Sequence, residues 1–372
     1  MNTLYFCLQE AVEHMHEIPT KVIRVDPFHP EVAIIKHAAE LIQKGQLVVF
    51  PTETVYGLGA DALQPQAIER IFTAKGRPFS DPLIVHIANR SILQTLVGDV
   101  PPAAHKLVDA FWPGPLTLIL PAGPSVPRLV TAGLPTVAIR MPRHPIALAL
   151  IRAAGSPIAA PSANRFMHVS PTTAQHVLAD LNGQVPLILD GGPCEVGVES
   201  TVLDLCSSRA TILRPGGVSL EALRMVLPEI QPPQPHPMTN HTSSKDELPQ
   251  VSPGQMLIHY SPAVPTFLFE GKTESMREAM LAEVQHRRAQ GEQVGVLVAD
   301  EDVTAFQESG AQIYALGNTI EQIAMHLFTG LRELEEAGVQ VILCRSFEAQ
   351  GLGLAIRDRL CKAAGGKIVQ VE

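Results

Sequence analysis

Apolar residues in the first 227 positions fall into short runs that are separated by polar and helix-type stretches. Such runs predict buried strands, and helical patterns between them predict a mixed α/β sheet. The predicted strands are 47–50, 82–87, 116–120, 136–141, 156–160, 186–190, 200–205 and 210–214. The connections 190–200 and 205–210 are too short for crossover helices, so the sheet should contain antiparallel pairs.

Helix signals stand between several of these strands. Apolar residues recur at helical spacing in 66–75, and Pro65 suits a first helical position. Ser170 followed by Pro171 is typical of a helix start, and the pair at 182–183, Asn-Gly, is typical of its end.

The last part of the chain alternates in the same way. It predicts strands at 266–269, 294–299, 312–316 and 339–344, and helices at 273–290, 319–337 and 352–364. Regular alternation of strand and helix predicts a small, separate, Rossmann-like α/β unit with a doubly wound sheet.

A proline-rich segment separates the two parts. Seven of the 26 residues in 228–253 are proline and few are apolar, which is typical of an extended linker. We therefore expect an N-terminal extension at 1–20, a first domain at 21–227, a linker at 228–262 and a second domain at 263–372.

Charge and cysteine content exclude some classes of protein. The net charge of −9 excludes a generally basic nucleic-acid coat, although residues 1–227 are close to neutral. The five cysteines form no C-x-x-C pair and no zinc spacing, which favours a reducing compartment. With no signal-peptide pattern at the start and no uninterrupted apolar span, we expect a soluble, cytoplasmic protein.

The first candidate for a functional site is the segment 51–59, PTETVYGLG. It formally matches the dinucleotide fingerprint G-x-G-x-x-G/A, but the glycines stand too far from the preceding strand and the following helix. Two other readings stay open at this point: a glycine turn, or a pocket at a strand end lined by Thr52 and Thr54.

Lys75 and Arg77 form a second candidate. A lysine at the end of a helix followed by glycine is an ordinary helix stop. That reading leaves Arg77 unexplained, since it precedes a proline in a short loop, and two cations there suit a phosphate site. Nearby His86 alternates with apolar neighbours, which alone is typical of a core histidine.

Other polar residues stand at or inside predicted strands. Ser162 and Asn164 follow a strand and are either turn residues or contacts for phosphate or ribose. Arg140 and Arg214 lie within apolar strands, where arginine needs an anionic partner, either a structural carboxylate or a substrate. No catalytic triad, Walker loop or H-E-x-x-H motif appears, so an ATP enzyme would use a site other than a P-loop.

Taken in order, these motifs resemble the YrdC-like family in its long, two-domain form. They are PTETVYGLG (51–59), KGRP (75–78), PLIVH (82–86), FWPGPLTLIL (111–120), AIRMP (138–142), APSAN (160–164), ESTV (199–202), ILRPG (212–216), SPGQMLIHYSP (252–262) and GLGLAIRDRLCKAAGG (351–366). The resemblance covers roughly residues 35–372. It implies a twisted mixed α/β sheet as the catalytic domain, with a second, smaller α/β domain.

The resemblance also implies a reaction. L-threonine, bicarbonate or CO2 and ATP give threonylcarbamoyl-adenylate and pyrophosphate, for threonylcarbamoyladenosine modification of tRNA. Mg2+ would come with ATP, because no dedicated protein site for it is seen. The product would pass to a downstream tRNA-modifying transferase complex, while direct binding of tRNA stays open.

Site residues follow from the same resemblance. The implied catalytic residues at the phosphates are Lys75, Arg77, Ser162 and Asn164. The implied ATP-binding residues are Arg77, Asp81, Thr136, Ser162, Ser170, Arg214, His259 and Tyr260. The implied threonine-binding residues are Thr54, His86, Arg140 and Ser200. Asp81 stands where some relatives carry a neutral amide.

Apolar and aromatic residues at 256–260 interrupt the linker composition, and the resemblance implies that this segment closes over the site as a lid. The alternative is that 254–261 forms the first strand of the second domain. Two other functions stay open: an RNA-binding module that holds an A-form helix by shape, and a carbamoyl-transfer enzyme of related fold.

Overall fold

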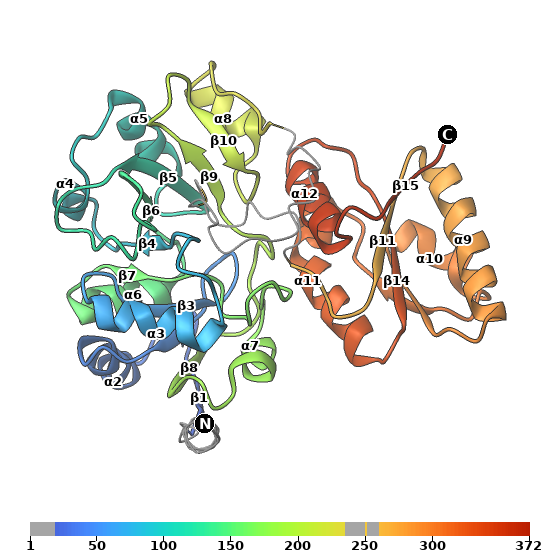
Figure 1. The fold of residues 1–372 in the computed structure, drawn as a ribbon, viewed down its shortest axis with the longest axis horizontal. Coiled ribbons are helices and arrows are strands. Elements are labelled where there is room, and N and C mark those ends of the chain that lie inside the picture. The colour runs from blue at the N-terminus through green and yellow to red at the C-terminus, as the bar shows by residue number, and fades with distance from the viewer. Residues whose placement is uncertain (1–18, 235–249, 251–259) are drawn as a thin grey trace, which may run out of the picture.

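A computed structural model describes residues 19–234, 250 and 260–372. These residues form two α/β units that lie side by side, the first built around a large sheet and the second around a smaller one (Figure 1). None of the described helices is long and apolar enough to cross a membrane.

The first unit contains a ten-stranded mixed sheet, which confirms the expected class of fold. Its strands are β1 (Lys21–Arg24), β2 (Val48–Phe50), β3 (Gly57–Asp61), β4 (Ile84–His86), β5 (Leu116–Pro121), β6 (Thr136–Arg140), β7 (Ile158–Ala159), β8 (Leu187–Asp190), β9 (Thr201–Asp204) and β10 (Thr211–Arg214). Their order is β1-β8-β2-β3-β7-β4-β6-β5-β9-β10. The sheet contains parallel pairs such as β4–β6 and antiparallel pairs such as β5–β6.

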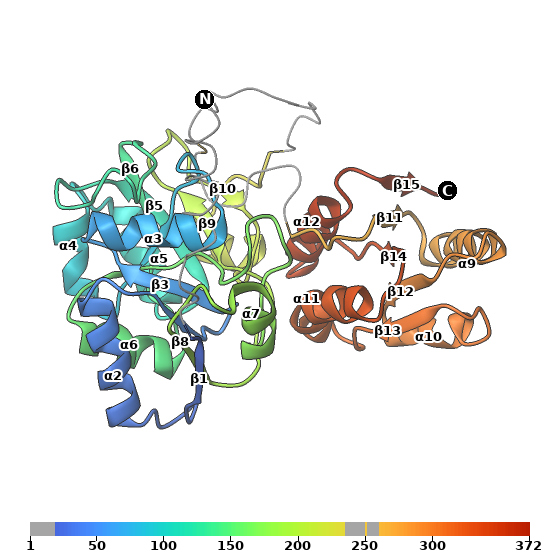
Figure 2. The ribbon, with the colours of Figure 1, turned by 60° about the horizontal axis from the view of Figure 1, so that its bottom comes forward.

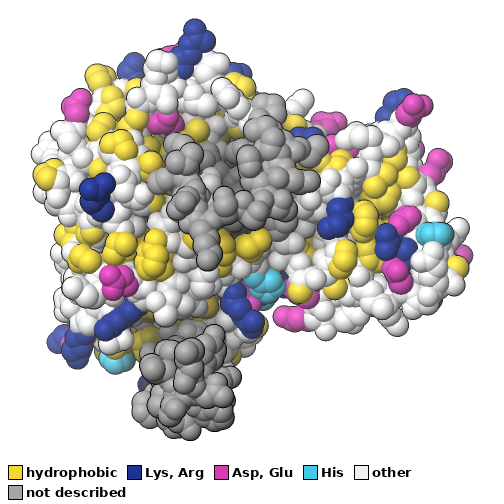
Figure 3. All heavy atoms as spheres, in the orientation of Figure 1, with side chains coloured by type: hydrophobic (Ala, Val, Ile, Leu, Met, Phe, Trp, Pro, Cys, Tyr) yellow, Lys and Arg dark blue, Asp and Glu magenta, His cyan; other side chains and the backbone are white. Residues whose placement is uncertain are grey.

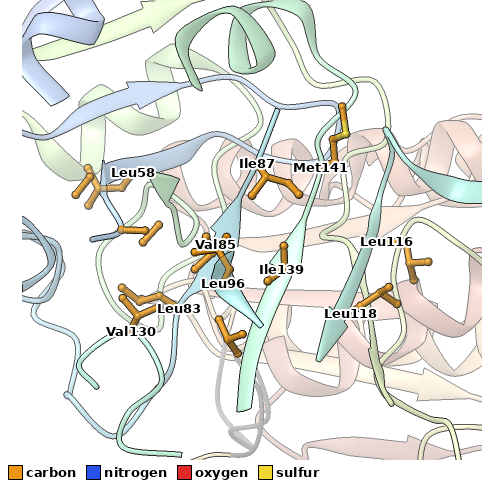
Figure 4. Packing of buried hydrophobic residues seen from close by; sticks show 14 of the residues in the cluster. Leu58, Leu83, Val85, Ile87, Leu96, Leu116, Leu118, Val130, Ile139 and Met141 are labelled. Atoms are coloured by element: carbon orange, nitrogen blue, oxygen red, sulfur yellow. The ribbon is translucent and has the colours of Figure 1, made fainter. Parts of the chain in front are cut away.

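Helices cover both faces of this sheet (Figure 2). They are α2 (Val32–Gln43), α3 (Pro65–Lys75), α4 (Leu93–Leu96), α5 (Pro102–Phe111), α6 (Pro145–Ala154), α7 (Ala174–Leu181) and α8 (Leu220–Val226), with a short 3-10 turn at Arg90–Ile92. Helices α2 and α6 pack together on one face, while α3, α5, α7 and α8 lie in the core of the other. Figure 4 shows this second core, where Val85, Ile139 and Leu118 pack from neighbouring strands.

Coverage of both faces explains the unbroken apolar runs. In β2, Val49 points into one core while Val48 and Phe50 point into the other. Because successive side chains of a strand alternate between faces, a strand that is buried on both sides is apolar at most of its positions. The apolar runs that predicted strands are therefore the strands of a sheet with two cores.

Two local expectations for the first unit were wrong, and one of the open readings, the glycine turn, is excluded. The glycines of the 57–61 segment lie in strand β3, and not in a turn. Helix α7 begins at Ala174, because the Thr173 side chain caps its first turn, and not at Pro171. The connection 190–200 does not join an antiparallel pair, since β8 and β9 lie far apart in the sheet; the connection 205–210 does, between β9 and β10.

The second unit is a five-stranded parallel sheet. Its strands are β11 (Thr266–Glu270), β12 (Val294–Val298), β13 (Gln312–Ala315), β14 (Val341–Arg345) and β15 (Ile368–Gln370), in the order β13-β12-β14-β11-β15. Helices α9 (Thr273–Ala289) and α10 (Asp300–Phe306) cover one face, and α11 (Ile320–Glu336) and α12 (Gly353–Ala363) the other. This arrangement confirms a doubly wound sheet; α10 and β15 had no clear sequence signal.

Residues at and just beyond the expected boundary at 227 belong to the packing of the first unit. Leu227 and Ile230 are buried in its core, and Gln231 pairs with Thr211 at the edge of the sheet. The chain therefore leaves the first unit at about Gln231.

The close approach of β3 to its neighbours gives a test of the sheet. In Gly59→Ala, the new Cβ would lie 2.6 Å from Phe50 Cε1 and 2.9 Å from Ile158 Cγ2. Because neither neighbour has room to move, we expect the free energy of unfolding to fall by about 1–3 kcal/mol, measured by urea denaturation. Gly98→Ala is the control, since its Cβ would meet only Ala122 O, at 3.9 Å. Equal stability of the two variants would contradict the packing of β3.

Candidate active site

A pocket lies where β4 and β6 end and where the loops that follow β2, β7 and β8 converge. The predicted site residues that line it are Thr54, Arg77, His86, Arg140, Ser162, Ser200, Arg214 and Tyr260. The predicted residues outside its lining are Lys75, Asp81, Thr136, Asn164 and Ser170. His259 and the rest of 251–259 lie outside the described residues.

Three buried arginines line this pocket: Arg77, Arg140 and Arg214. Each is fixed by backbone carbonyls, with a carboxylate or a hydroxyl completing its contacts. Guanidinium groups that are held in place and face a cavity suit an anionic ligand with several oxygens. The lining of the pocket is therefore chemically suited to phosphate or carboxylate groups.

The Arg77 side chain contacts residues of the loop that follows it in the chain. Its Nη2 lies 2.9 Å from Asp81 Oδ1 and donates to Pro82 O at 2.7 Å. Burial raises the pKa of the Asp81 carboxyl, while Arg77 and Lys75 oppose that rise. Asp81 thus holds Arg77 from behind and does not itself reach the pocket.

Lys75 shapes the loop that carries Ser162. The Nζ atom of this buried lysine donates to Ser162 O and Asn164 O, both at 2.5 Å. The Asn164 amide in turn donates to His168 O at 2.8 Å. Burial, with Arg77 nearby, lowers the pKa of Lys75 well below its usual value. In this structure Lys75 and Asn164 hold the loop, whereas Ser162 lines the pocket.

Arg140 has the structural carboxylate that its buried position demanded. Its Nη2 lies 2.8 Å from Glu53 Oε1, its Nη1 donates to Thr54 Oγ1 at 2.8 Å, and its Nε donates to Gly114 O. Glu53 is 1% exposed. We did not single out Glu53 from the sequence, although it is the one carboxylate in the segment PTETVYGLG.

His86 lies beside Arg140 because β4 and β6 run parallel with these two residues in register. Burial, reinforced by Arg140, lowers the pKa of His86 to about 3. The ring is therefore neutral at physiological pH, with Nδ1 at 3.2 Å from Ile84 O. A neutral imidazole next to Arg140 suits hydrogen bonding to a substrate better than proton transfer.

Ser200 and Arg214 also line the pocket and contact each other. Arg214 Nη2 donates to Ser200 O at 3.0 Å and contacts its Oγ at 3.2 Å. The hydroxyls of Ser200 and Thr117 are 2.7 Å apart. These contacts join the start of β9 to the end of β10 at the rim of the pocket.

Tyr260 is the residue of the linker segment that the structure places at the pocket. Its ring is 1% exposed, stacks on Phe328 with centroids 5.7 Å apart, and lies under the Arg359 guanidinium at 4.8 Å. Burial raises its pKa to about 12. The first strand of the second unit begins only at Thr266, so Tyr260 lies between the units and not in that strand.

Within the described residues, no group of three or more His, Cys, Asp or Glu side chains is placed to hold a metal ion. Glu199 lines the pocket and is ion-paired with Arg359; Glu53 stands between the lining residues Thr52 and Thr54 and is ion-paired with Arg140.

The two units meet through a second set of charged contacts, away from the pocket. Arg332 Nη2, from α11, lies 2.8 Å from Asp180 Oδ2 in α7. His168 bridges the units: its Nδ1 lies 2.9 Å from Asp180 and its Nε2 lies 3.0 Å from Glu335. Glu335 also accepts from Ala263 N, where the chain enters the second unit.

Fold and site together define a two-domain α/β protein with an arginine-lined pocket for anionic substrates. Residues 40–216 match the Sua5/YciO/YrdC family model, whose description reads telomere recombination. Residues 218–365 match the model described as the C-terminal domain of threonylcarbamoyl-AMP synthase.

Known proteins resemble this chain over nearly its whole length. A threonylcarbamoyl-AMP synthase of Pyrococcus abyssi is 44% identical, over 91% of this chain and 96% of the relative. One of Bacillus subtilis is 45% identical, over 90% and 94%. The crystal structure of P. abyssi Sua5 complexed with L-threonine superposes with a TM-score of 0.87 at 43% identity, covering 95% of this chain and all of that chain. The chain therefore belongs to the Sua5/YciO/YrdC family and, within it, to the two-domain threonylcarbamoyl-AMP synthases.

The His168 bridge predicts a pH-dependent contribution to stability. Burial alone would lower the pKa of His168, but hydrogen bonds to Asp180 and Glu335 raise it above its ordinary value of 6.5. The contribution of this bridge to the free energy of unfolding is therefore fully present below pH 6.5, and it is lost as the pH rises through the raised pKa of His168. Between pH 6 and pH 8.5, we expect Tm to fall by about 2 °C more in the wild type than in His168→Gln.

The matched control for that measurement is His29→Gln, because His29 is exposed on the surface of the first unit. It should follow the wild-type pH dependence. If His168→Gln also follows the wild type, the bridge adds no pH-dependent stability.

Proposed function

We propose that this chain joins L-threonine, bicarbonate or CO2 and ATP to give threonylcarbamoyl-AMP and pyrophosphate. The observation that carries the proposal is the pocket lined by Arg77, Arg140 and Arg214 in a chain so similar to named threonylcarbamoyl-AMP synthases. The P. abyssi Sua5 structure contains L-threonine, which supports threonine as a substrate here.

The chemistry suits a pocket without a protein nucleophile. The amine of threonine captures CO2 and loses a proton, which gives an N-carboxylate. That carboxylate attacks the α-phosphorus of ATP in line, an oxygen–phosphorus bond forms, and pyrophosphate leaves. Because the substrate supplies the nucleophile, the protein needs only to place the anions and to stabilise the charge that develops.

We assign the threonine subsite to the wall formed by Thr54, His86, Arg140 and Ser200. Arg140 already holds Glu53 and Thr54, so its orientation is set before substrate arrives. A fixed guanidinium is the natural partner of the threonine carboxylate. Neutral His86 can hydrogen-bond without adding charge.

We assign the nucleotide subsite to Arg77, Ser162, Arg214 and Tyr260, which line the pocket. Lys75 and Asn164 support it by holding the loop of Ser162. Roles for Asp81, Thr136, Ser170 and His259 in ATP binding stay predictions. We propose that Mg2+ enters bound to the phosphates of ATP.

We further propose that a downstream tRNA-modifying transferase complex takes the product. The cytoplasmic location also stays a prediction. Figure 3 shows one face of the molecule, on which basic and acidic side chains of the described residues are scattered and form no continuous basic band. That face therefore offers no support to an RNA-binding module.

Release of pyrophosphate from ATP tests the proposed function. Release should require threonine and bicarbonate, each omitted in turn. Release without threonine, or with carbamoyl phosphate in place of threonine and bicarbonate, would contradict the proposal and favour carbamoyl transfer. An RNA-binding module would release no pyrophosphate.

Arg140→Lys tests the threonine subsite. Lysine keeps the charge but loses the planar fork, so the apparent affinity for threonine should fall by about 10- to 150-fold. The affinity for ATP should change little. Arg143→Lys is the control, because Arg143 is half exposed and pairs with Glu195 on the surface. Unchanged threonine affinity in a folded Arg140→Lys protein would leave Arg140 as a partner of Glu53 only.

Arg77 is tested together with Asp81, because removing the arginine alone would leave a buried carboxylate unpaired. Asp81→Asn alone should keep most of the turnover, since Asp81 lies behind Arg77. Arg77→Ala with Asp81→Asn should lower turnover by about 10²–10³-fold, as loss of a preorganised charge does elsewhere. Equal turnover of the single and double variants would remove Arg77 from catalysis.

Lys75→Ala belongs to the same series. We expect it to lower turnover similarly, and also Tm, because two buried carbonyls lose their donor. If Lys75→Ala lowers Tm but turns over normally, the helix-end reading of Lys75 is correct.

A further inference from the structure

Arg359 belongs to the second unit but ends against the first. It lies in α12, one of the two helices that face the first unit (Figure 1), and its side chain is 0% exposed. Its Nε donates to Glu199 Oε2 at 2.7 Å, and its Nη2 donates to Pro215 O at 3.1 Å. Both partners are first-unit residues.

One of these partners, Glu199, itself lines the pocket, and both adjoin a residue that does. Glu199 directly precedes Ser200, and Pro215 directly follows Arg214. Arg214 and Ser200 are joined on the pocket side by hydrogen bonds of 3.0 and 3.2 Å. Arg359 joins the same two segments from behind.

The segment that contains Glu199 and Ser200 and the segment 214–217 are packed backbone against backbone. Gly217 N donates to Glu199 O at 3.0 Å, and a Cβ on Gly216 would lie 2.3 Å from Glu199 O. The second oxygen of the Glu199 carboxylate accepts from Ser170 Oγ at 2.6 Å. Ser170, a predicted nucleotide residue outside the pocket lining, is therefore connected to the pocket wall through Glu199.

The charges around Glu199 show what Arg359 prevents. Burial alone would raise the pKa of Glu199, but Arg359 and then Arg214 hold it below its ordinary value. Without Arg359, the buried carboxylate would either take up a proton or draw Arg214 toward itself, because an unpaired buried charge is costly. Either change would disturb a guanidinium that faces the pocket.

We propose that Arg359 is a positioning residue of the active site: it holds Glu199 and Pro215 in place, so that Ser200 and Arg214 keep the spacing that binds substrate. The second unit thus contributes to substrate binding through a side chain that touches no substrate. This inference rests on the proposed function for its kinetic readout.

Two other arginines serve as matched controls. Arg332 also crosses between the units and is 2% exposed, but its partners, Asp180 and the Val169 carbonyl, do not line the pocket. Arg357 lies on the same helix as Arg359 and pairs with Glu270 inside the second unit. Arg332 therefore tests simple attachment of the units, and Arg357 tests the helix itself.

Kinetics of the full-length chain separate positioning from attachment. In Arg359→Met, the apparent KM for ATP and for threonine should rise by about 10-fold or more. Arg359→Lys should recover part of the loss, because it keeps the charge beside Glu199 but cannot also reach Pro215. Arg332→Met should keep both KM values within about 2-fold even where its Tm falls as far, and Arg357→Met should resemble the wild type. If R359M and R332M have the same KM values, Arg359 is only an attachment and the inference is wrong.

The pH profile gives a readout that attachment alone would not move. Loss of Arg359 raises the pKa of Glu199, so the acidic limb of kcat/KM should move to higher pH in R359M. Adding Glu199→Gln should abolish that movement, because no carboxylate is left to titrate. An unmoved acidic limb in a folded R359M protein would also count against the inference.

Hydrogen exchange tests the positioning role of Arg359 without depending on enzymatic activity. Amides of residues 199–202 and 212–217 should exchange faster in R359M than in R332M. If the wild type releases no pyrophosphate, the proposed function fails, and these exchange rates still support or overturn the positioning role. If R359M does not fold, the exchange rates of R359K and of the double variant E199Q/R359M are compared with those of R332M instead.

Discussion

Pairing between buried arginines and buried carboxylates is the constraint on which the site depends. Moving either ion out of water costs several kcal/mol, and the pair repays this only when its geometry is good and its remaining hydrogen bonds are made. Glu199–Arg359 meets this condition, because the pair is hydrogen-bonded and Ser170 and the Pro215 carbonyl take up a further acceptor and donor. In Glu53–Arg140 the facing atoms are 2.8 Å apart as an ion pair, and the other guanidinium nitrogens donate to Thr54 and the Gly114 carbonyl. The pairs fix where guanidinium groups point before any substrate is present.

The sheet decides which of these charges meet. Parallel pairing of β4 with β6 places His86 beside Arg140, although 53 residues lie between them in the chain. Both faces of the sheet are covered by helices, so polar groups gather where strands end and loops converge. The pocket is therefore a property of strand order as much as of the motifs that line it.

The second unit is joined to the first by contacts of two kinds. Arg332 and His168 connect surfaces that lie away from the pocket. Tyr260 lines the pocket, and Arg359 lies behind it with its guanidinium over the Tyr260 ring. A small doubly wound domain at this position is thus part of the site's surroundings and not a separate appendage.

The sequence alone determined the class of fold, most strands, the helices α3, α9, α11 and α12 to within one or two residues, and the motifs around the pocket, because apolar periodicity and turn residues act locally. Only the tertiary structure decided which distant residues these side chains contact. It placed the glycines of β3 in a strand paired with β2 and β7, where Phe50 and Ile158 leave no room for a Cβ on Gly59. It turned Lys75 toward loop carbonyls and brought Arg359 to Glu199, because buried charges pair with whatever the packing of distant segments puts beside them.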